Sequence, residues 1–485
     1  MKILIAASEA FPFCKTGGLA DVTGALAQVF SRMPETEVVL FLPRYRNVGG
    51  GAFSPKATGG SFLIPVGSRV ETATMSRVQW GKVAVYFLEN PKFFDRPGLY
   101  RTATGDYEDN DERFIFFSRA VLEGAKFIGF KPDVIHCHDW QTGLVPAYMR
   151  TLYRIDSFYS KTASVFTIHN IAYQGMFPKE TLLKAGFSWM DFTPEKLEYY
   201  GGVNFMKAGL AYADLITTVS PTYAGEIQYR PEFGHGMEGL LKHRTADLFG
   251  ILNGIDEEIW DPATDTFLDR GYELKSFGRG KAAAKKALQK ELGLEENKDL
   301  ILAGVVSRLD RQKGLDVLLR AAPEFLDKMQ FVVLGAGDPG LSDAFTALAE
   351  ANPGRVAFRT GFDEELAHRI YGGSDIFAMP SRFEPCGLSQ MIAMRYGSLP
   401  VVTRTGGLKD TVYYNGEPKD SNGFAIDNPD EGQLKSVLGH IISLYGWREN
   451  WNMMVRNAMR GDYSWGKSAE AYIKLFAIAA QRRQL

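Results

Sequence analysis

Uninterrupted apolar runs recur along the chain and alternate with segments in which apolar residues have helical spacing. In the first half, the runs occupy residues 2–8, 38–43, 83–89, 133–138, 164–170 and 215–220. In the second half, they occupy residues 300–309, 330–338, 356–361, 375–381 and 399–407. Runs that do not alternate with polar residues are typical of parallel strands buried on both faces. The pattern predicts an α/β protein with two doubly wound, Rossmann-like sheets in tandem.

The segment between the two sets of runs marks a domain boundary. Residues 252–265 are polar, rich in turn-forming residues and without apolar periodicity, so we interpret them as a hinge. We expect an N-terminal domain over 1–252 and a C-terminal domain over 253–460. The last part of the chain has helical spacing and no strand pattern. Its final segment, 461–485, is a candidate to cross back to the N-terminal domain.

Composition and charge exclude several classes of protein. A chain of 485 residues, 45% hydrophobic and 23% charged, exceeds one typical core and is ordinary for a soluble globular protein. Its 55 basic and 57 acidic residues give a net charge of -2, so we expect neither nucleic acid nor a membrane as a partner. No apolar run could span a bilayer, and no signal or transit segment precedes the first run. We expect a cytoplasmic protein, or a mature form already trimmed.

Several common motifs are absent. Cys14, Cys137 and Cys386 form neither an even disulfide set nor a CxxC pattern, which fits a reducing compartment. The sequence GAGD at 335–338 lacks the full GxGxxG spacing of a dinucleotide site. A G-x-S-x-G elbow, a Walker A loop and an HExxH helix are also missing, which weakens hydrolase, nucleoside-triphosphatase and metalloprotease interpretations.

The stretch KTGGLADV, residues 15–22, follows the first apolar run and has an echo, RTGGLKDTV, at 404–412. Apolar spacing predicts that an amphipathic helix begins near Gly18. Its first N–H groups are unpaired, the glycines allow close approach of a ligand, and Lys15 adds a positive charge, with Asp21 nearby. The alternative is a plain strand-to-helix turn that needs glycine for a positive φ.

Two stretches of the second half carry further candidate chemistry. At 307–316, Arg308, Arg311 and Lys313 follow a strand, where a guanidinium and an ammonium together suit a diphosphate. The alternative is a solvated cluster of positive charge. At 380–397, Glu384 precedes a helix that opens through CGLSQ, and its carboxylate can accept hydrogen bonds from sugar hydroxyls. The alternative is a helix N-terminal carboxylate favoured by the dipole.

The stretch HCHDW, residues 136–140, places two histidines on one face of a strand but shows no third metal ligand of suitable spacing. We therefore expect no metal site. We expect Asp139, at the C-terminal end of a buried strand, to face the interdomain cleft, with the histidines packing or hydrogen-bonding around it. His169 and Asn170 end the next strand in the same way. A satisfied structural histidine is the alternative there.

Seven stretches, taken together, resemble the bacterial glycogen synthase and plant starch synthase family in order and spacing, from residue 1 to about residue 470. They are KTGGLADV, HCHDWQTGLVPAYM, FTIHNIAYQGMF, GILNGIDEEIWDPATD, SRLDRQKGLD, SRFEPCGLSQ and RTGGLKDTV. The resemblance implies a GT-B glycosyltransferase, with two Rossmann-like domains facing each other across a deep cleft. It implies transfer of glucose from ADP-glucose to the non-reducing 4-hydroxyl of glycogen or a maltooligosaccharide, with retention of configuration and no metal or organic cofactor.

The resemblance also implies roles for individual residues. Lys15 matches the ADP-glucose-binding lysine, Arg308 and Lys313 match the pair that neutralises the departing diphosphate, and Glu384 matches the carboxylate that grips the glucose hydroxyls. Asp139 and His169 match residues at the reacting sugar, where the main-chain carbonyl of His169 stabilises positive charge. The other substrate-binding positions are Gly17, Gly18, Asp21, Asn253, Phe362, Cys386, Gly387, Leu388, Thr405, Gly406 and Gly407.

At two positions this sequence departs from the pattern of its relatives. Ile392 stands where many relatives with this fold have a second glutamate, and Phe362 stands where many have a tyrosine stacked on adenine.

Retention by double displacement needs a carboxylate nucleophile, for which Asp139 is the candidate. We favour front-face substitution, because cations and helix N-termini outnumber candidate nucleophiles. Rival functions are a UDP-glucose-dependent sucrose or trehalose synthase, a phosphorylase, and an inactive glucan-binding scaffold.

Overall fold

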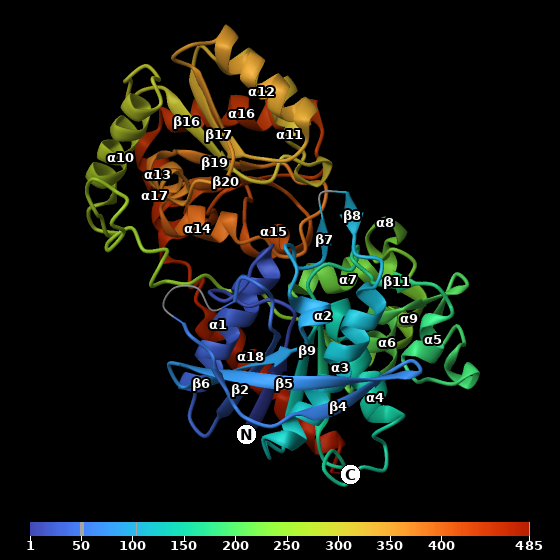
Figure 1. The fold of residues 1–485 in the computed structure, drawn as a ribbon. Helices are drawn as coiled ribbons and strands as arrows, with labels where there is room; N and C mark the ends of the chain where they lie inside the picture. The colour runs from blue at the N-terminus through green and yellow to red at the C-terminus, as the bar shows by residue number, and fades with distance from the viewer. Residues whose placement is uncertain (49–52, 103, 485) are drawn as a thin grey trace. The chain divides into compact units, whose positions relative to one another are not determined.

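The computed structural model describes residues 1–48, 53–102 and 104–484. The chain forms two compact units, colour-ramped along the sequence in Figure 1. The first unit comprises Met1–Val219, Ala224–Ile251 and Ser468–Leu485. The second unit comprises Ser220–Tyr223 and Leu252–Lys467. The last helix therefore completes the unit that the beginning of the chain builds.

The first unit is built on a ten-stranded sheet with the order β15-β14-β10-β9-β1-β2-β6-β5-β3, in which β4 pairs with β5. Its parallel part consists of β1 (Lys2–Ala6), β2 (Glu37–Pro43), β6 (Val83–Glu89), β9 (Val134–His138), β10 (Ala163–Ile168), β14 (Leu215–Thr218) and β15 (Leu248–Gly250). The six apolar runs of the first half form six of these strands, so the predicted parallel sheet is confirmed.

An antiparallel extension of this sheet was not predicted. It consists of β3 (Lys56–Ala57), β4 (Phe62–Val66) and the long strand β5 (Arg69–Trp80), which pairs with β6 and carries β3 and β4. Residues of β5 alternate between exposed and buried over much of its length, so the strand lacks the continuous apolar run used to find the others. Two small sheets are separate from it: β7 (Arg101–Thr102) with β8 (Gly105–Asp106), and β11 (Met176–Phe177), β13 (Gly202–Asn204) and β12 (Glu198–Tyr199).

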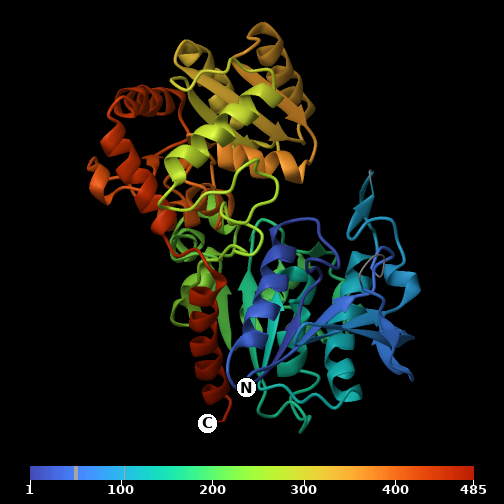
Figure 2. The same ribbon diagram turned by 90° about the vertical axis from the view of Figure 1, so that its left-hand side faces the viewer.

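Helices pack on both faces of the first sheet, as expected for a doubly wound fold. The helices that lie wholly or mostly in this unit are α1 (Gly18–Arg32), α2 (Pro91–Phe94), α3 (Asn110–Phe127), α4 (Leu144–Arg150), α5 (Thr181–Lys184), α6 (Phe205–Tyr212), α7 (Pro221–Tyr229), α8 (Pro231–Gly234), α9 (Glu238–His243) and α18 (Trp465–Arg482). The C-terminal helix α18, red in Figure 2, packs against α1, where the rings of Phe30 and Phe476 are 5.4 Å apart. Tyr472 of α18 also lies 5.2 Å from the ring of His136 in β9.

The second unit has a six-stranded parallel sheet with the order β18-β17-β16-β19-β20-β21. Five strands coincide with predicted runs: β16 (Ile301–Val306), β17 (Met329–Gly335), β18 (Val356–Thr360), β19 (Ile376–Met379) and β20 (Leu399–Thr403). The sixth, β21 (Phe424–Ile426), is too short to give a periodic signal. The helices are α10 (Phe277–Glu291), α11 (Leu315–Ala321), α12 (Pro339–Ala351), α13 (Glu364–Gly373), α14 (Ser389–Arg395), α15 (Gly406–Thr411), α16 (Glu431–Tyr445) and α17 (Arg448–Arg460).

Among the described residues, no helix has both the length and the apolar character needed to cross a bilayer.

Candidate functional site

Most of the predicted residues lie at the carboxyl ends of the parallel strands of their own unit, which is where open α/β sheets bind ligands. In the first unit, the loop after β1 carries Lys15 and leads into α1, which begins at Gly18 as predicted. The Lys15 ammonium lies 2.7 Å from a carboxylate oxygen of Asp21, and both side chains are partly exposed. Lys15, Gly17, Gly18 and Asp21 therefore gather at one helix opening.

The two glycines of this opening are not required by local packing. Gly17 has a φ of -158°, which is extended backbone that any residue adopts. A Cβ atom added at Gly17 or Gly18 would meet no atom within 4 Å. The alternative interpretation, a turn that needs glycine for a positive φ, is therefore wrong at this position. The glycines leave the free N–H groups of α1 open to an anionic ligand.

Asp139 follows β9 directly and is buried, with a φ of 54° and a ψ of -176°. Its carboxylate accepts the main-chain N–H of His169, which follows β10, at 2.8 Å. Burial raises the pKa of Asp139 to about 7, with the negative charge of Glu9 acting in the same direction. Main-chain N–H groups of His169 and Asn170 oppose that shift because they stabilise the ionised form. The structure thus joins two predicted residues, Asp139 and His169, by one hydrogen bond.

Three histidine rings line the strand ends beside Asp139. His138 Nδ1 and His169 Nε2 are 2.9 Å apart, and His136 Nε2 is 2.7 Å from Thr167 Oγ1. Burial lowers the pKa of His136 and of His169 to about 3, so both rings are neutral near pH 7. Within the described part of the chain, no group of three or more His, Cys, Asp or Glu side chains is placed to hold a metal ion.

The second unit brings Lys313 and Glu384 together at the ends of β16 and β19. Lys313 Nζ is 2.5 Å from Glu384 Oε2, and Ser381 Oγ donates to the same oxygen at 3.3 Å. Their side chains are only 18% and 9% exposed, so water screens the pair weakly. Asp310 orients Lys313 by accepting its main-chain N–H at 3.1 Å. The sequence did not predict that these two candidate residues form an ion pair with each other.

Arg308 lies beside this pair along the chain but is more exposed. Its guanidinium is 3.3 Å from a carboxylate oxygen of Asp310, and 61% of its side chain is exposed. Phe362, in the loop between β18 and α13, has 87% of its surface exposed. Both side chains are therefore accessible to a ligand without displacing a packed neighbour.

The second TGGL tetrapeptide differs physically from the first. Thr405 precedes α15, and Gly406 has a φ of 44° in the left-handed region. A Cβ atom at Gly406 would lie 1.9 Å from the carbonyl oxygen of Glu384, and one at Gly407 would lie 2.3 Å from that of Cys386. These glycines are required because α15 packs directly against the backbone that carries Glu384.

The remaining predicted residues of the second unit surround this contact. Cys386 is buried, which raises the pKa of its thiol to about 12, and the main-chain N–H of Asn253 donates to it. Asn253 Oδ1 is buried and has no hydrogen-bond partner among the described residues, so it is an acceptor available to a ligand. Gly387 has a φ of 74°, and Leu388 directly precedes α14.

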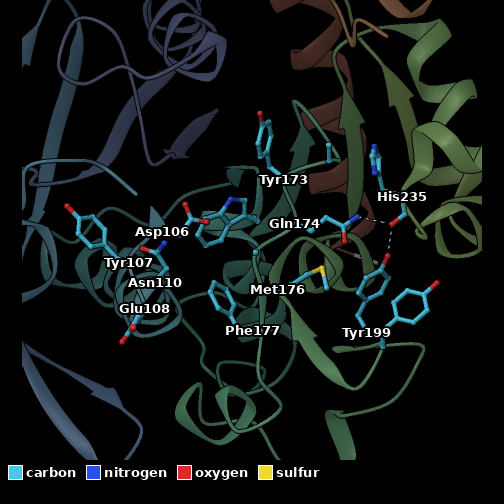
Figure 3. Close-up of a pocket in the computed structure, with 14 residues that line it drawn as sticks. Asp106, Tyr107, Glu108, Asn110, Tyr173, Gln174, Met176, Phe177, Tyr199 and His235 are labelled. Carbon is cyan, nitrogen blue, oxygen red and sulfur yellow. Dashed lines mark hydrogen bonds between the residues drawn. The ribbon is translucent and has the colours of Figure 1, made fainter. Parts of the chain in front are cut away.

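A groove of about 890 Å³ in the first unit was missed by the sequence reasoning (Figure 3). Its aromatic lining comes from separate elements: Tyr107, Trp140, Tyr173, Phe177, Tyr199 and Tyr200. Its polar lining consists of Asp106, Glu108, Asn110, Gln174 and His235. Gln174 Nε2 and Tyr199 OH both donate to the carbonyl oxygen of His235, at 3.0 and 2.5 Å, as the dashed lines in Figure 3 show. The aromatic residues in HCHDW, IAYQGMF and EYYGG were the signal for this groove.

Rings that alternate with carboxylates and amides suit a carbohydrate chain. The C–H faces of a pyranose ring pack on aromatic faces, while its hydroxyls bond to carboxylates and amides. Trp140 lines the groove, and its ring lies 5.7 Å from that of Phe177 in the lining and 4.8 Å from that of Phe114 outside it. Because Trp140 is adjacent to Asp139 in sequence, the groove begins beside the candidate reacting residues of the same unit.

Solved structures of similar proteins define the class of this fold. The catalytic domain of starch synthase IV from Arabidopsis thaliana, solved with ADP and acarbose bound, matches with a TM-score of 0.90 and 34% identity over 99% of each chain. Sucrose-phosphate synthase from Thermosynechococcus elongatus shares the fold, with a TM-score of 0.61 and 17% identity over 98% of this chain and 99% of that one. The protein is a glycosyltransferase of the GT-B class.

Sequence comparisons give the family. The model of the starch synthase catalytic domain matches residues 2–243, and that of glycosyl transferases group 1 matches residues 285–458. A glycogen synthase of Elusimicrobium minutum is 54% identical over 98% of this chain and 99% of its own length. One of Syntrophotalea carbinolica is 47% identical over 99% of both. The chain belongs to the glycogen and starch synthase family and is a glucosyltransferase.

Proposed function

We propose that this protein transfers glucose from ADP-glucose to the non-reducing 4-hydroxyl of an α-1,4-glucan, with retention of anomeric configuration. The observation that carries the proposal is the buried contact between Lys313 and Glu384. It puts a cation for a diphosphate next to a carboxylate for sugar hydroxyls, which are the two groups that a nucleotide sugar presents together. The similar starch synthase IV was solved with ADP bound, which supports a donor of this kind.

The donor's diphosphate is held by charged side chains in this proposal. Lys313 and Arg308 of the second unit neutralise the phosphate oxygens. Lys15 supplies a further cation at the opening of α1, for which it must exchange Asp21 for phosphate. The exposed ring of Phe362 stacks on the base without offering a hydroxyl.

The acceptor occupies the aromatic groove of the first unit. Its volume of about 890 Å³ fits several glucose units, and its rings are spread along its walls. The acarbose in the similar starch synthase IV is itself an oligosaccharide analogue, which supports a glucan ligand. Trp140 places the non-reducing end beside Asp139 and His169.

Front-face substitution accounts best for retention. The bond between the anomeric carbon and the diphosphate oxygen breaks, the acceptor 4-oxygen bonds to that carbon on the same face, and the departing phosphate takes the hydroxyl proton. Lys313 and Arg308 stabilise the charge that develops on the diphosphate. Asp139 is the candidate nucleophile for the alternative double displacement, but its carboxylate already accepts the N–H groups of His169 and Asn170. We assign it the role of holding the His169 carbonyl toward the reacting sugar.

An assay of ADP release tests the function directly. Glycogen is incubated with ADP-glucose or UDP-glucose, and the new linkages are identified by NMR from their anomeric protons. We expect release of ADP, a preference for ADP-glucose, α-1,4 products, and no loss of activity in EDTA, because Lys313 and Arg308 supply the positive charge. Transfer from UDP-glucose to fructose would instead support a sucrose synthase, and no transfer to any glucan would support a binding scaffold.

A further inference from the structure

A buried glutamate anchors the loop that carries Lys15. Glu9, just after β1, is only 3% exposed. Its Oε1 accepts the hydroxyl of Thr16 at 2.6 Å, and its Oε2 accepts the main-chain N–H of Thr16. The carbonyl oxygen of Glu9 also accepts the Thr23 hydroxyl from α1, at 2.5 Å. Because Thr16 stands between Lys15 and Gly17, these bonds fix the opening of α1.

Tyr100 connects the same carboxylate to the aromatic groove. Its hydroxyl donates to Glu9 Oε1 at 2.5 Å and is 2.7 Å from Ser8 Oγ. Its carbonyl oxygen accepts the main-chain N–H of Tyr107 and the side-chain amide of Asn110, both at 3.0 Å. Tyr107 and Asn110 line the groove. One residue therefore bonds to the Lys15 loop through its side chain and to the groove wall through its backbone.

The fold alone does not require a carboxyl group at the buried position of Glu9. No lysine or arginine among the described residues forms an ion pair with it, and hydrogen bonds from Thr16 and Tyr100 hold its side-chain oxygens. A buried carboxylate of this kind costs free energy that an apolar side chain would not. An amide at this position would also turn an NH₂ group toward the N–H of Thr16 or toward the hydroxyls. Both side-chain oxygens of Glu9 must therefore accept hydrogen bonds in order to orient the loop.

We propose that Glu9 and Tyr100 are positioning residues that tie the Lys15 loop to the wall of the aromatic groove and so couple donor binding to acceptor binding within the first unit. The inference rests on the proposed function, because it assigns the donor phosphate to the loop and the glucan to the groove. Coupling of this kind is reciprocal: a glucan that orders the wall strengthens donor binding, and the donor strengthens glucan binding by the same factor.

Tyr100→Phe is the sharpest test, because it removes the hydroxyl and keeps the ring that lies 6.0 Å from the ring of Phe114. The matched control is Tyr148→Phe, which removes a buried hydroxyl bonded to the carbonyl of Ala185 at 2.9 Å, away from loop and groove. ADP affinity is measured by calorimetry with and without maltoheptaose, and KM is measured for ADP-glucose and for maltoheptaose.

We expect maltoheptaose to tighten ADP binding in the wild type and in Tyr148→Phe, and to leave it unchanged in Tyr100→Phe. Both KM values of Tyr100→Phe should rise by about tenfold, the range for one hydrogen bond to a charged group. Glu9→Gln should behave in the same way, and the double variant should be no worse than the poorer single variant.

Three results would overturn the inference: no effect of maltoheptaose on ADP binding in the wild type, unchanged coupling in Tyr100→Phe, or equal losses in Tyr148→Phe. Failure of the proposed function is distinguishable from these, since a wild type that binds ADP and maltoheptaose with coupling but releases no ADP from ADP-glucose refutes the transfer reaction alone.

Discussion

At the scale of single residues, the buried ion pair of Lys313 and Glu384 is the contact on which the proposed donor site of the second unit rests. Breaking a buried pair by removing one partner leaves an uncompensated charge, so each single change affects the other residue. For Glu384→Ala we expect turnover to fall by roughly 10²-fold, because the carboxylate positions the reacting carbon. For Lys313→Gln we expect weaker ADP binding as well as slower turnover.

Calorimetry with ADP and steady-state rates with ADP-glucose check both variants. Arg320→Gln is a suitable control, because Arg320 forms an exposed ion pair with Asp316 in α11. ADP affinity in Lys313→Gln equal to that of the wild type would remove Lys313 from the diphosphate site. Normal turnover in a folded Glu384→Ala protein would remove the carboxylate from the sugar site.

The raised pKa of Asp139 makes the stability of the first unit depend on pH, with a sign that can be worked out. Its pKa rises from 3.8 to about 7 on folding, while the rings of His138 and His169 stay neutral and the charge of Glu9 adds to the shift. Between these values the folded state binds more protons than the unfolded state. The stabilising contribution of Asp139 is therefore complete below about pH 4 and is lost as the pH rises through about 7.

Asp139→Asn removes this titration and provides the measurement. Urea unfolding of the wild type and the variant is compared at pH 5 and pH 8, where other groups change equally in both proteins. The free energy of unfolding of the variant, relative to the wild type, should be higher at pH 8 than at pH 5. The same relative stability at both pH values would show that Asp139 ionises normally.

At the scale of elements, the two TGGL helix openings have the same sequence for different structural reasons. Alanine at Gly17 meets open space, whereas alanine at Gly406 meets the carbonyl of Glu384 and a left-handed φ. We expect Gly17→Ala to keep the melting temperature within about 2 °C and to raise the KM for ADP-glucose. Gly406→Ala should lower the melting temperature by several degrees, at a cost of about 2 kcal/mol or more.

Thermal unfolding and steady-state kinetics on the two variants separate ligand access from packing. Gly439→Ala in α16 is the control, since a Cβ atom there also meets nothing within 4 Å and the residue lies outside the predicted site. Equal loss of stability in Gly17→Ala and Gly406→Ala would contradict the distinction. The sequence alone cannot reveal this distinction, because the two identical tetrapeptides differ only in what packs against them.

The sequence predicted those strands whose burial on both faces produces a continuous apolar run along the chain. Strands such as β1 after its exposed Lys2, and β16, are covered on both faces and so are apolar. β5 alternates, and β21 has three residues, so neither gives such a run. The same limit applies to the site. Lys15 and Glu384 stand in recognisable motifs, but the contact of Glu9 with Tyr100, 91 residues away, exists only once the sheet has formed.

At the scale of the whole molecule, the chain uses its last helix to finish the core of its first unit. Tyr472, Phe476 and Ala479 of α18 are fully buried, and Arg482 pairs with Asp247 at 2.6 Å. Each large apolar side chain buried in this way contributes about 1.5–3 kcal/mol. The stability of the first unit therefore depends on residues made last, more than 200 positions after the rest of that unit.

A chain that ends at Lys467 tests this dependence. We expect calorimetry to show the transition of the first unit at a lower temperature, or absent, because its sheet is left with an uncovered apolar strip over Phe30 and His136. The transition of the second unit should shift little, and ADP should still stabilise it if the proposed site at Lys313 and Arg308 is correct. Arg482→Ala in the full chain is the control, since it removes only a partly exposed ion pair. An unchanged first transition in the shortened chain would mean that α18 covers the sheet without stabilising it.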